Sequence, residues 1–406
     1  MSGTTVDPRL ANARAAPKRG LQISWSDPVF RSIVWQVVII GLVVGVIWYL
    51  ASNTGRNLEQ RHIATGLDFL SKTAGIPIAE TLIPYEPSVS TWGRAVAEGI
   101  LNTLKVAVVG IVLSTILGTL IGVGRLSKNW LLAKITSVYV ETLRDIPVLL
   151  QLLFWYSLLQ ALPEPPNSVN FFNVAFLTQR GLKLPILDWQ PAHWAMLAAF
   201  VVGIAGTLVW NRSANRKRDE TGIKPAVWPA AVALMIGLPV IVWAALGAPW
   251  DVEFPRLGGF RNRNFVGGGT ITPEYFALLL GLVLYTAAYI AEIVRSGIQA
   301  VPKGQWEAAG ALGLHPASVL RMVVLPQALR VIIPPMTSQF LNLTKNSSLA
   351  VAIGFQDVVS ISGTMLNQTG QAIEGVGIIM AVFLSFSLSI SLFMNWYNAR
   401  IALVER

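Results

Sequence analysis

Residues 301–330 read VPKGQWEAAGALGLHPASVLRMVVLPQALR, and the pattern of this stretch bears most directly on the fold. It predicts two short helices around a turn. The first helix runs through residues 306–312, and Gly313 can adopt the left-handed backbone conformation that ends a helix. Pro316 suits the first position of a second helix, and Pro326 predicts a break before the apolar segment that follows.

The segments on either side of this hairpin are unusually apolar. Apolar residue types make up 53% of the chain, and Asp, Glu, Lys and Arg only 13%, against about a quarter in soluble domains. Several runs approach the ~20 residues that cross a bilayer as a helix. We therefore expect an all-α polytopic membrane protein, folded as a transmembrane helical bundle.

The apolar runs predict about eight spans. They cover residues 32–51, 95–124, 135–160, 192–210, 226–247, 273–294, 327–355 and 373–395. The fourth and fifth are short and are interrupted by Gly and Pro. Pro334 and Pro335 predict a break in the seventh, because proline removes a helical hydrogen bond and clashes with the preceding turn.

Basic residues indicate the orientation. Lys and Arg are about twice as frequent in the connections that this arrangement places in the cytoplasm, as the positive-inside rule expects. Residues 211–225 form the most basic of these loops. Both termini are then cytoplasmic, with a disordered tail at residues 1–31 and a second tail at residues 397–406. The net charge of +10 follows from the same bias, so no nucleic-acid partner is expected.

The sequence offers no chemistry of its own. It has no Cys, and His62, His193 and His315 lie far apart, so neither a metal site nor a disulfide is predicted. It lacks a G-x-x-x-x-G-K-[ST] phosphate loop, His-x-x-x-His, Gly-x-Ser-x-Gly and acidic clusters within spans. We predict a transport subunit rather than an enzyme, with no catalytic residues and no cofactor.

The hairpin resembles the EAA loop of ABC importer permeases. The residues in the family register are Glu307, Ala308, Ala309, Gly313, Leu325 and Pro326. Val323 stands where that family usually has Ile. The resemblance implies that the loop forms two coupling helices that dock in a groove of an ATP-binding cassette ATPase dimer. It also implies that Glu307 and the small residues beside it contact the ATPase, which would hydrolyse ATP as a separate subunit.

Other stretches resemble the polar-amino-acid permeases within that group. They are GILNTLKVAVVG (99–110), YVETLRDIPVLLQLLFWY (139–156), AAYIAEIVRSGIQAVPKGQWEAAGALGL (287–314) and LNLTKNSSLAVAIGFQDV (341–358). The resemblance implies a type I core of five spans in two halves, residues 95–160 and 273–396, with the coupling loop at 301–326. Residues 32–94 would add a span and a periplasmic loop, and residues 161–272 would add loops and a helix pair.

This enlarged layout is similar to the general L-amino-acid permease subunits of Gram-negative bacteria. The resemblance implies an inner-membrane protein that pairs with a second, related permease and receives substrate from a periplasmic binding protein. A narrower importer of glutamate, glutamine, aspartate and asparagine is the alternative, since such permeases share the layout. The sequence does not decide whether the substrate site lies in this subunit or in its partner.

Ionisable residues within spans are candidates for a polar path, because a charge in the bilayer costs about 2.5–3.5 kcal/mol. The candidates are Lys345, Asn346, Glu141, Arg144, Glu292 and Arg295. They can bind a zwitterionic substrate, or each acid–base pair can be an ion pair within its own helix, since residues three apart share a face. Lys105 is expected to snorkel or to pair with another helix.

Two other classes compete with an ABC permease. An ion-coupled secondary transporter would show internal repeats with broken helices around a central site, and the two halves show no convincing repeat. A membrane-embedded enzyme would need a metal cluster, an activated nucleophile or paired acids, none of which the sequence contains.

Overall fold

The computed structural model describes residue 25 and residues 28–60, 66–223, 225–259 and 263–401. Its contacts divide the chain into two units, residues 1–67 and residues 68–406. The first unit holds helix α1 (Pro28–Gln60), which contains the expected first span and has no buried residue in its most apolar window. Its 33 residues reach roughly 50 Å at 1.5 Å per residue, more than a bilayer core requires.

The second unit is built mainly of helices. They are η1 (Asp68–Ser71), α2 (Trp92–Gly124), α3 (Trp130–Asp145), α4 (Val148–Gln160), η2 (Pro165–Asn167), α5 (Pro191–Thr221), α6 (Trp228–Val232), η3 (Ala233–Gly237), α7 (Leu238–Ala245), α8 (Pro273–Gln299), α9 (Lys303–Ala311), α10 (Pro316–Val319), η5 (Leu320–Val324), α11 (Leu325–Asn346), η6 (Ser347–Ile353), α12 (Val358–Thr369) and α13 (Ala372–Ile401). Within the described residues, seven helical segments are long and apolar enough to cross a membrane.

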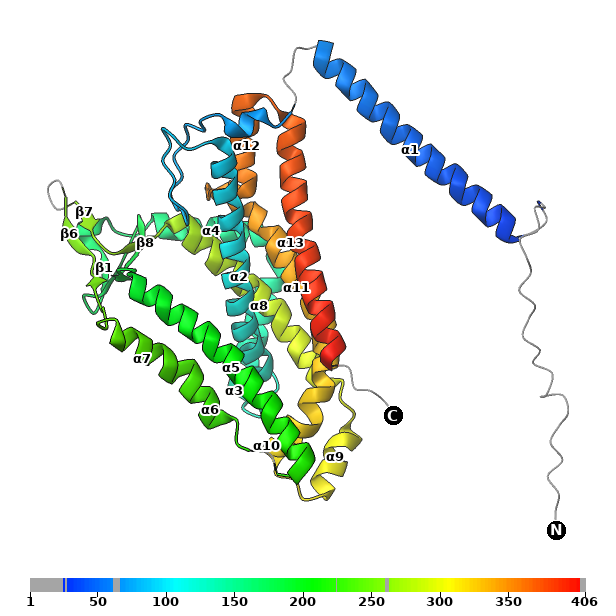
Figure 1. The fold of residues 1–406 in the computed structure, drawn as a ribbon, viewed down its shortest axis with the longest axis vertical. Coiled ribbons are helices and arrows are strands. Elements are labelled where there is room, and N and C mark those ends of the chain that lie inside the picture. Colours follow the sequence, from blue (N-terminus) through cyan, green and yellow to red (C-terminus); the bar gives the residue numbers. More distant parts are fainter. Residues whose placement is uncertain (1–24, 26–27, 61–65, 224, 260–262, 402–406) are drawn as a thin grey trace. The chain divides into compact units, whose positions relative to one another are not determined.

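Helix α8 is the centre of the second unit, packed against α2, α3, α4 and α11. The helices α2 and α8 approach closely because α2 presents glycines. A Cβ at Gly118 would lie 2.7 Å from Cβ of Ile290, and one at Gly122 would lie 2.7 Å from the carbonyl oxygen of Ala291. Small residues allow such close contact between helices in lipid. Figure 1 shows α2 and α8 crossing in the middle of the unit, with α12 and α9 at opposite ends.

Polar residues fix where several helices begin. Thr91, Asn129, Thr272 and Asp357 are the N-caps of α2, α3, α8 and α12, and the side chain of each accepts a hydrogen bond from a backbone N–H of the first turn. Such caps satisfy N–H groups that have no partner within the helix.

The expected third span, residues 135–160, is wrong as one helix. The structure has two helices, α3 and α4, separated at Ile146 and Pro147. Proline restricts the residue before it to an extended conformation, and Ile146 has φ −88° and ψ 127°. Helix α4 has only 13 residues and is too short to span a bilayer alone.

The breaks expected at three prolines are also corrected. Pro326 lies in the first turn of α11, directly after the π-helical turn η5, and the helix continues through Pro334 and Pro335 to Asn346. Proline removes one N–H donor, but its fixed φ is compatible with a helix. π-Helix is rare, and where it occurs it is mostly a single turn within a longer α-helix, as here.

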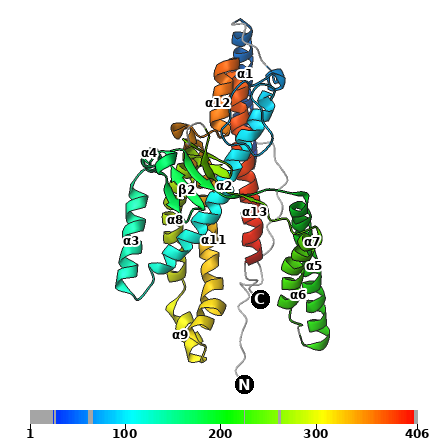
Figure 2. The ribbon, with the colours of Figure 1, turned by 90° about the vertical axis from the view of Figure 1, so that its left-hand side faces the viewer.

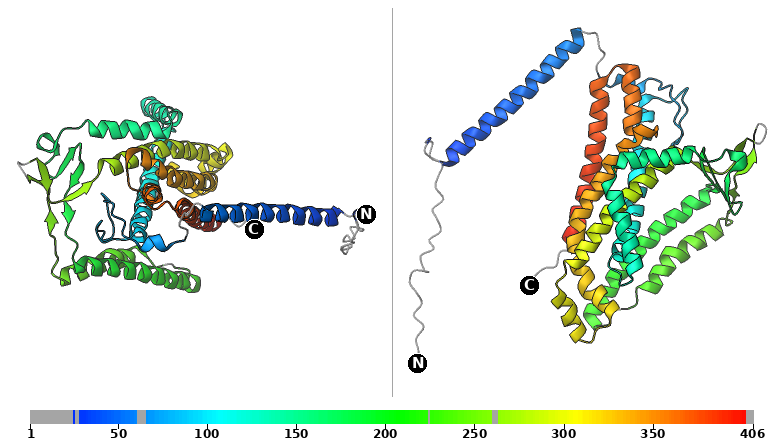
Figure 3. Two further views of the ribbon diagram at one scale, coloured as in Figure 1. Left: turned by 90° about the horizontal axis from the view of Figure 1, so that it is seen from above. Right: turned by 180° about the vertical axis from the view of Figure 1, so that it is seen from behind.

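The expected helix pair is present as α5 and the α6–η3–α7 segment, which pack on each other. The contact is close at Gly203, where a Cβ would lie 2.1 Å from the carbonyl oxygen of Leu234. The basic loop expected at 211–225 is largely helical, since α5 continues to Thr221 and ends at Gly222, φ 74°. Figure 2 and the left panel of Figure 3 show this pair on the side of the core opposite α3 and α4.

Short strands in the two connections around this pair were not predicted. A four-stranded antiparallel sheet has the order β1 (Val169–Phe171), β2 (Ala175–Thr178), β3 (Gly181–Leu184), β8 (Gly269–Ile271), and two further ladders pair β4 (Ile186–Leu187) with β5 (Val252–Glu253) and β6 (Arg256–Gly258) with β7 (Asn264–Val266). The pairing of Leu182 with Ile271 joins the two connections and leads into α8 at Pro273.

The expected tails need a smaller correction. Residues 28–31 belong to α1 and residues 397–401 belong to α13, so both helices extend further than the apolar runs indicate. The other residues of both expected tails lie outside the described helices, and almost all of them lie outside the described residues.

Candidate functional site

The hairpin of residues 301–330, which contains the expected coupling loop, has a well-defined turn. Helix α9 ends in a Schellman motif: the N–H of Leu314 donates to the carbonyl of Ala309 at 3.3 Å, and the N–H of Gly313 donates to that of Gly310 at 2.9 Å. Gly313 has φ 74°, as its expected role requires. Pro316 begins α10, and the side chain of His315 accepts from the backbone N–H of Ala317.

One face of the hairpin is anchored in the unit. Ala309, Val319 and Val324 are buried in a cluster with residues of α8 and α11. Ala309 is only 4% exposed, so its expected contact with a partner is corrected: this alanine packs inward, whereas Glu307 and Ala308 are exposed. Anchoring at these points lets a force on the hairpin reach α8 and α11.

The opposite face carries exposed apolar side chains, of which the sequence analysis singled out only Leu325. Leu312 is 81% exposed, Met322 60% and Leu325 40%, and Trp306 is also exposed. Pro326 is half-buried. Exposed Met and Trp are typical of surfaces that bind another protein.

Glu292 of α8 lies between two arginines. It forms ion pairs with Arg295 on the same helix and with Arg125 at the end of α2, and Arg125 also donates to Ser137 Oγ of α3 at 3.3 Å. The expected Glu292–Arg295 ion pair within one helix is therefore present. The network joins α2, α3 and α8 and leaves one positive charge in excess.

Glu141 and Arg144 do not form the corresponding ion pair. Both are exposed on α3, and the guanidinium of Arg144 lies over the ring of Tyr289, 5.0 Å from its centroid. The hydroxyl of Tyr285 lies 3.2 Å from that of Tyr289. These groups gather along the contact of α3 with α8, on the same face as Glu292.

Lys345 and Asn346 lie apart from that group, at the far end of α11. Lys345 is exposed and Asn346 half-buried, and no ion pair involves Lys345 in the described part of the chain. The structure thus places four of the six candidate path residues on the neighbouring helices α3 and α8, and the other two at the end of α11.

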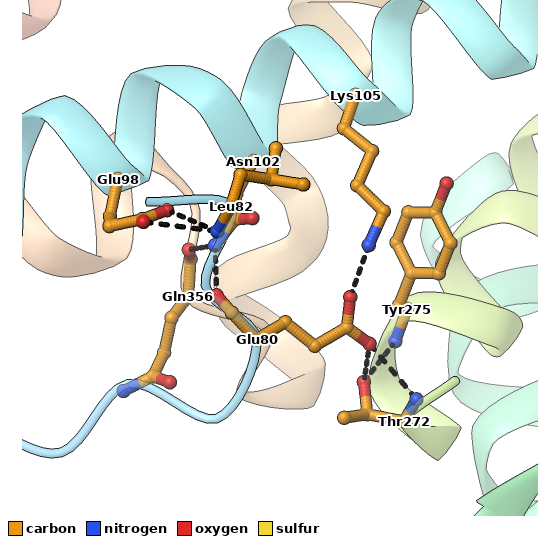
Figure 4. Close-up of polar contacts among 8 residues, drawn as sticks. All are labelled: Glu80, Leu82, Glu98, Asn102, Lys105, Thr272, Tyr275 and Gln356. Atoms are coloured by element: carbon orange, nitrogen blue, oxygen red, sulfur yellow. Dashed lines mark hydrogen bonds and ion pairs between the residues drawn. The ribbon is translucent and has the colours of Figure 1, made fainter. Parts of the chain in front are cut away.

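A polar cluster at the α12 end of the unit was missed by the sequence analysis (Figure 4). Glu80 accepts hydrogen bonds from the N–H and the hydroxyl of Thr272, and it forms an ion pair with Lys105 at 2.5 Å. The ammonium of Lys105 also lies 4.0 Å from the ring centroid of Tyr275. Lys105 is therefore paired, with a carboxylate from a loop rather than from another helix.

Glu98 and Asn102 extend this cluster along α2. The buried carboxylate of Glu98 accepts from the backbone N–H groups of Leu82 and Ile83, at 3.0 and 2.6 Å from Oε1. Glu98, Asn102 and Lys105 follow the i, i+4, i+7 spacing of one helix face, and this spacing is the signal by which the sequence could have shown them.

Asp357 caps α12 beside the cluster, and its carboxylate accepts from the N–H of Ser360 at 2.8 Å. Burial raises its pKa to about 7, although the hydrogen bonds from backbone N–H groups act in the opposite direction. The helix α2 approaches this cap closely, since a Cβ at Gly99 would lie 2.9 Å from Cα of Val358.

Comparisons with known proteins agree with this architecture. Residues 227–403 match the family described as the binding-protein-dependent transport system inner membrane component. The chain is 51% identical over 94% of its length to the general L-amino acid transport system permease AapQ of Rhizobium johnstonii, and this covers 94% of that protein. It is 48% identical over 95% of its length to the putative amino-acid ABC transporter permease YhdX of Escherichia coli, covering 97% of that protein.

A third relative is named for a narrower set of amino acids. The glutamate/glutamine/aspartate/asparagine transport system permease BztB of Rhodobacter capsulatus is 42% identical over 98% of this chain and is covered completely. Identities of this size over nearly whole chains establish the family. The protein belongs to the binding-protein-dependent ABC transporter permeases, and it is a multi-pass inner-membrane transport subunit.

Proposed function

We propose that this chain is one of two related permease subunits of an importer that moves L-amino acids across the inner membrane at the expense of ATP. A separate ATPase dimer docks on the coupling hairpin. The main support for this proposal is that the hairpin has one exposed and one buried face. Leu312, Met322 and Glu307 are exposed and available to a partner. Val319 and Val324 anchor the same segment in the helical core.

The substrate class follows from the relatives. AapQ is named for general L-amino acid transport, and its identity with this chain exceeds that of BztB, which is named for glutamate, glutamine, aspartate and asparagine. A broad range of L-amino acids is therefore the proposed substrate class. The full-length similarity to BztB makes the narrower range the second candidate.

Substrate comes from a periplasmic binding protein and passes between alternately open sides of the permease pair. The candidate path comprises Glu141, Arg144, Glu292 and Arg295 along α3 and α8, with Lys345 and Asn346 further along. Arg144 is the leading cation for a substrate carboxylate, because it is exposed, lies over the ring of Tyr289 and forms no ion pair with any described residue. Arg125 and Arg295 are already paired with Glu292.

Uptake of a labelled amino-acid panel tests the proposal. Cells with and without this subunit are compared, with each amino acid also competed against the others. Loss of uptake of most L-amino acids supports the broad importer, and loss confined to the acidic amino acids and their amides supports the narrow one. Unchanged uptake of every member contradicts the proposed function.

The orientation, with both termini in the cytoplasm, is tested by labelling introduced cysteines, because the chain has none of its own. Leu312 and Phe172 are both highly exposed, at 81% and 97%. In intact spheroplasts, an impermeant maleimide should label Phe172→Cys and should label Leu312→Cys only after the membrane is opened. The reverse result would place the hairpin outside, where no ATPase can reach it.

A further inference from the structure

A small cavity lies beside the polar cluster, between the segment before α2, the N-terminal half of α2, the start of α8 and the turn before α12. Its volume is about 150 Å³, and since water occupies ~30 Å³ in the liquid it has room for several waters or for a small polar group. The polar side chains that line it are those of Glu80, Asn102, Thr272, Glu274 and Gln356.

Asn102, one of the residues that line this cavity, has an unused acceptor. Its side chain is 1% exposed, and its amide nitrogen donates to the carbonyls of Glu80 and Gln356, each at 3.0 Å. Two carbonyl partners fix the orientation of the amide, because the oxygen cannot take the place of the nitrogen. Oδ1 is then a buried acceptor with no donor in the described part of the chain, although buried polar atoms nearly always have a partner.

The charges around the cavity do not cancel. Glu80 is neutralised by Lys105, whereas Glu274 forms no ion pair with any described residue and accepts one hydrogen bond, from the hydroxyl of Tyr156 at 3.2 Å. The cavity therefore carries one uncompensated negative charge together with one unused neutral acceptor.

We propose that this cavity is a subsite for a primary ammonium group, with Asn102 Oδ1 and the Glu274 carboxylate as its acceptors. An ammonium supplies one positive charge and three N–H donors, which is what these two groups lack. If the proposed function holds, the physiological ligand is the α-ammonium of an L-amino acid before it enters the path along α3 and α8. Thr272 and Lys105 act here by holding Glu80 in place.

Salts of defined cations test the subsite on the purified permease–ATPase complex. A ligand that binds only the folded state raises the melting temperature with its concentration. Methylammonium chloride should raise it above the value in equal concentrations of sodium chloride and of tetramethylammonium chloride, whose cation has no N–H. If sodium chloride raises the melting temperature equally, the effect is one of metal cations or of ionic strength, and the proposal is overturned. It is also overturned if methylammonium chloride does not raise the melting temperature above the values in the other two salts.

Two carboxylate variants localise the effect. Glu274→Gln keeps the size and the acceptor for Tyr156 but removes the charge, so the methylammonium effect should disappear. Glu164→Gln changes an exposed carboxylate outside the cavity and should keep it. An undiminished methylammonium effect in Glu274→Gln contradicts the proposal. The comparison of salts on the wild-type complex stands alone if the Glu274 variant does not assemble.

Uptake by proteoliposomes separates this proposal from the proposed function. With a loaded binding protein outside, Glu274→Gln should lower the initial rate about tenfold or more, as expected for losing a charge-assisted hydrogen bond, and Glu164→Gln should transport like the wild type. If the wild type moves no amino acid, the proposed function fails, while the salt experiment still decides the subsite. Normal uptake by both variants contradicts only the part of the ammonium subsite in transport.

Discussion

Glu80 and Thr272 lie 192 positions apart in the sequence, and Thr272 donates to one carboxylate oxygen of Glu80 twice, from its backbone N–H at 2.9 Å and from its hydroxyl at 2.6 Å. Thr272 is at the same time the N-cap of α8. The loop that precedes α2 is thereby fastened to the start of the central helix, and Lys105 adds α2 to the same carboxylate.

Removing the charge of Glu80 should weaken this fastening. Glu80→Gln leaves the ammonium of Lys105 without its carboxylate, although the ring of Tyr275 remains beside it. We expect a loss of about 1–3 kcal/mol in the free energy of unfolding, the range for breaking a charged hydrogen bond at a partly buried site. Heat denaturation of the purified permease measures it, and Glu164→Gln is the control on the exposed surface. Equal melting temperatures for both variants would contradict the role given to Glu80.

A second prediction concerns the contact of α2 with α8. Gly118→Ala places a Cβ 2.7 Å from Ile290 and 2.8 Å from the carbonyl oxygen of Ala287, and overpacking of this kind costs about 1–3 kcal/mol. Gly41→Ala is the matched control, because a Cβ at that position of α1 has no neighbour within 4 Å and alanine favours a helix. The first variant should melt at a lower temperature than the wild type and the second should not. A Gly118 variant as stable as the wild type would show that the contact of α2 with α8 has room for a methyl group.

A third prediction concerns the exposed face of the hairpin. Leu312→Asp puts a charge on a side chain that is 81% exposed, so the permease itself should stay folded. Docking of the ATPase should weaken at least tenfold, because a charge buried in an apolar contact pays a large desolvation penalty. Co-purification of the two subunits measures the docking.

Ile223→Asp and Glu307→Lys complete this experiment. Ile223 is 76% exposed at the end of α5, on the side of the membrane where we place the hairpin, and its replacement should leave docking unchanged. Glu307→Lys should reduce docking as Leu312→Asp does. Normal co-purification and transport by both hairpin variants would remove the coupling role from this loop.

The sequence predicted those parts of the structure that depend on neighbouring residues. Long apolar runs gave the spans, and Gly313 with Pro316 gave the turn of the hairpin. The division of α3 from α4 was also within reach, because Pro147 lies inside the apolar run and proline commonly ends a helix just before it. The π-turn at residues 320–324 left no such mark, since Pro326 is compatible with both a break and a distorted helix.

The rest depends on contacts between distant positions. The strands β3 and β8 have four and three residues, too few for an alternating pattern. Lys183 pairs with Thr270 although α5 to α7 lie between them in the sequence. The polar cluster is of the same kind. Glu98, Asn102 and Lys105 share a helix face, but their partners Leu82, Gln356 and Glu80 come from two other segments.

The cap of α12 gives a prediction for pH. Because burial raises the pKa of Asp357 from 3.8 to about 7, the folded state keeps this proton at pH values where the unfolded state has lost it. Between about pH 4 and pH 7 the folded state therefore binds more protons, so this residue's contribution to stability decreases as the pH rises and becomes constant above about pH 7. The melting temperature of the wild type should fall across that interval by more than that of Asp357→Asn, since asparagine is an equally good N-cap with no charge to lose. Parallel melting curves for the two proteins from pH 5 to pH 8 would show that Asp357 is already ionised throughout that range in the folded state.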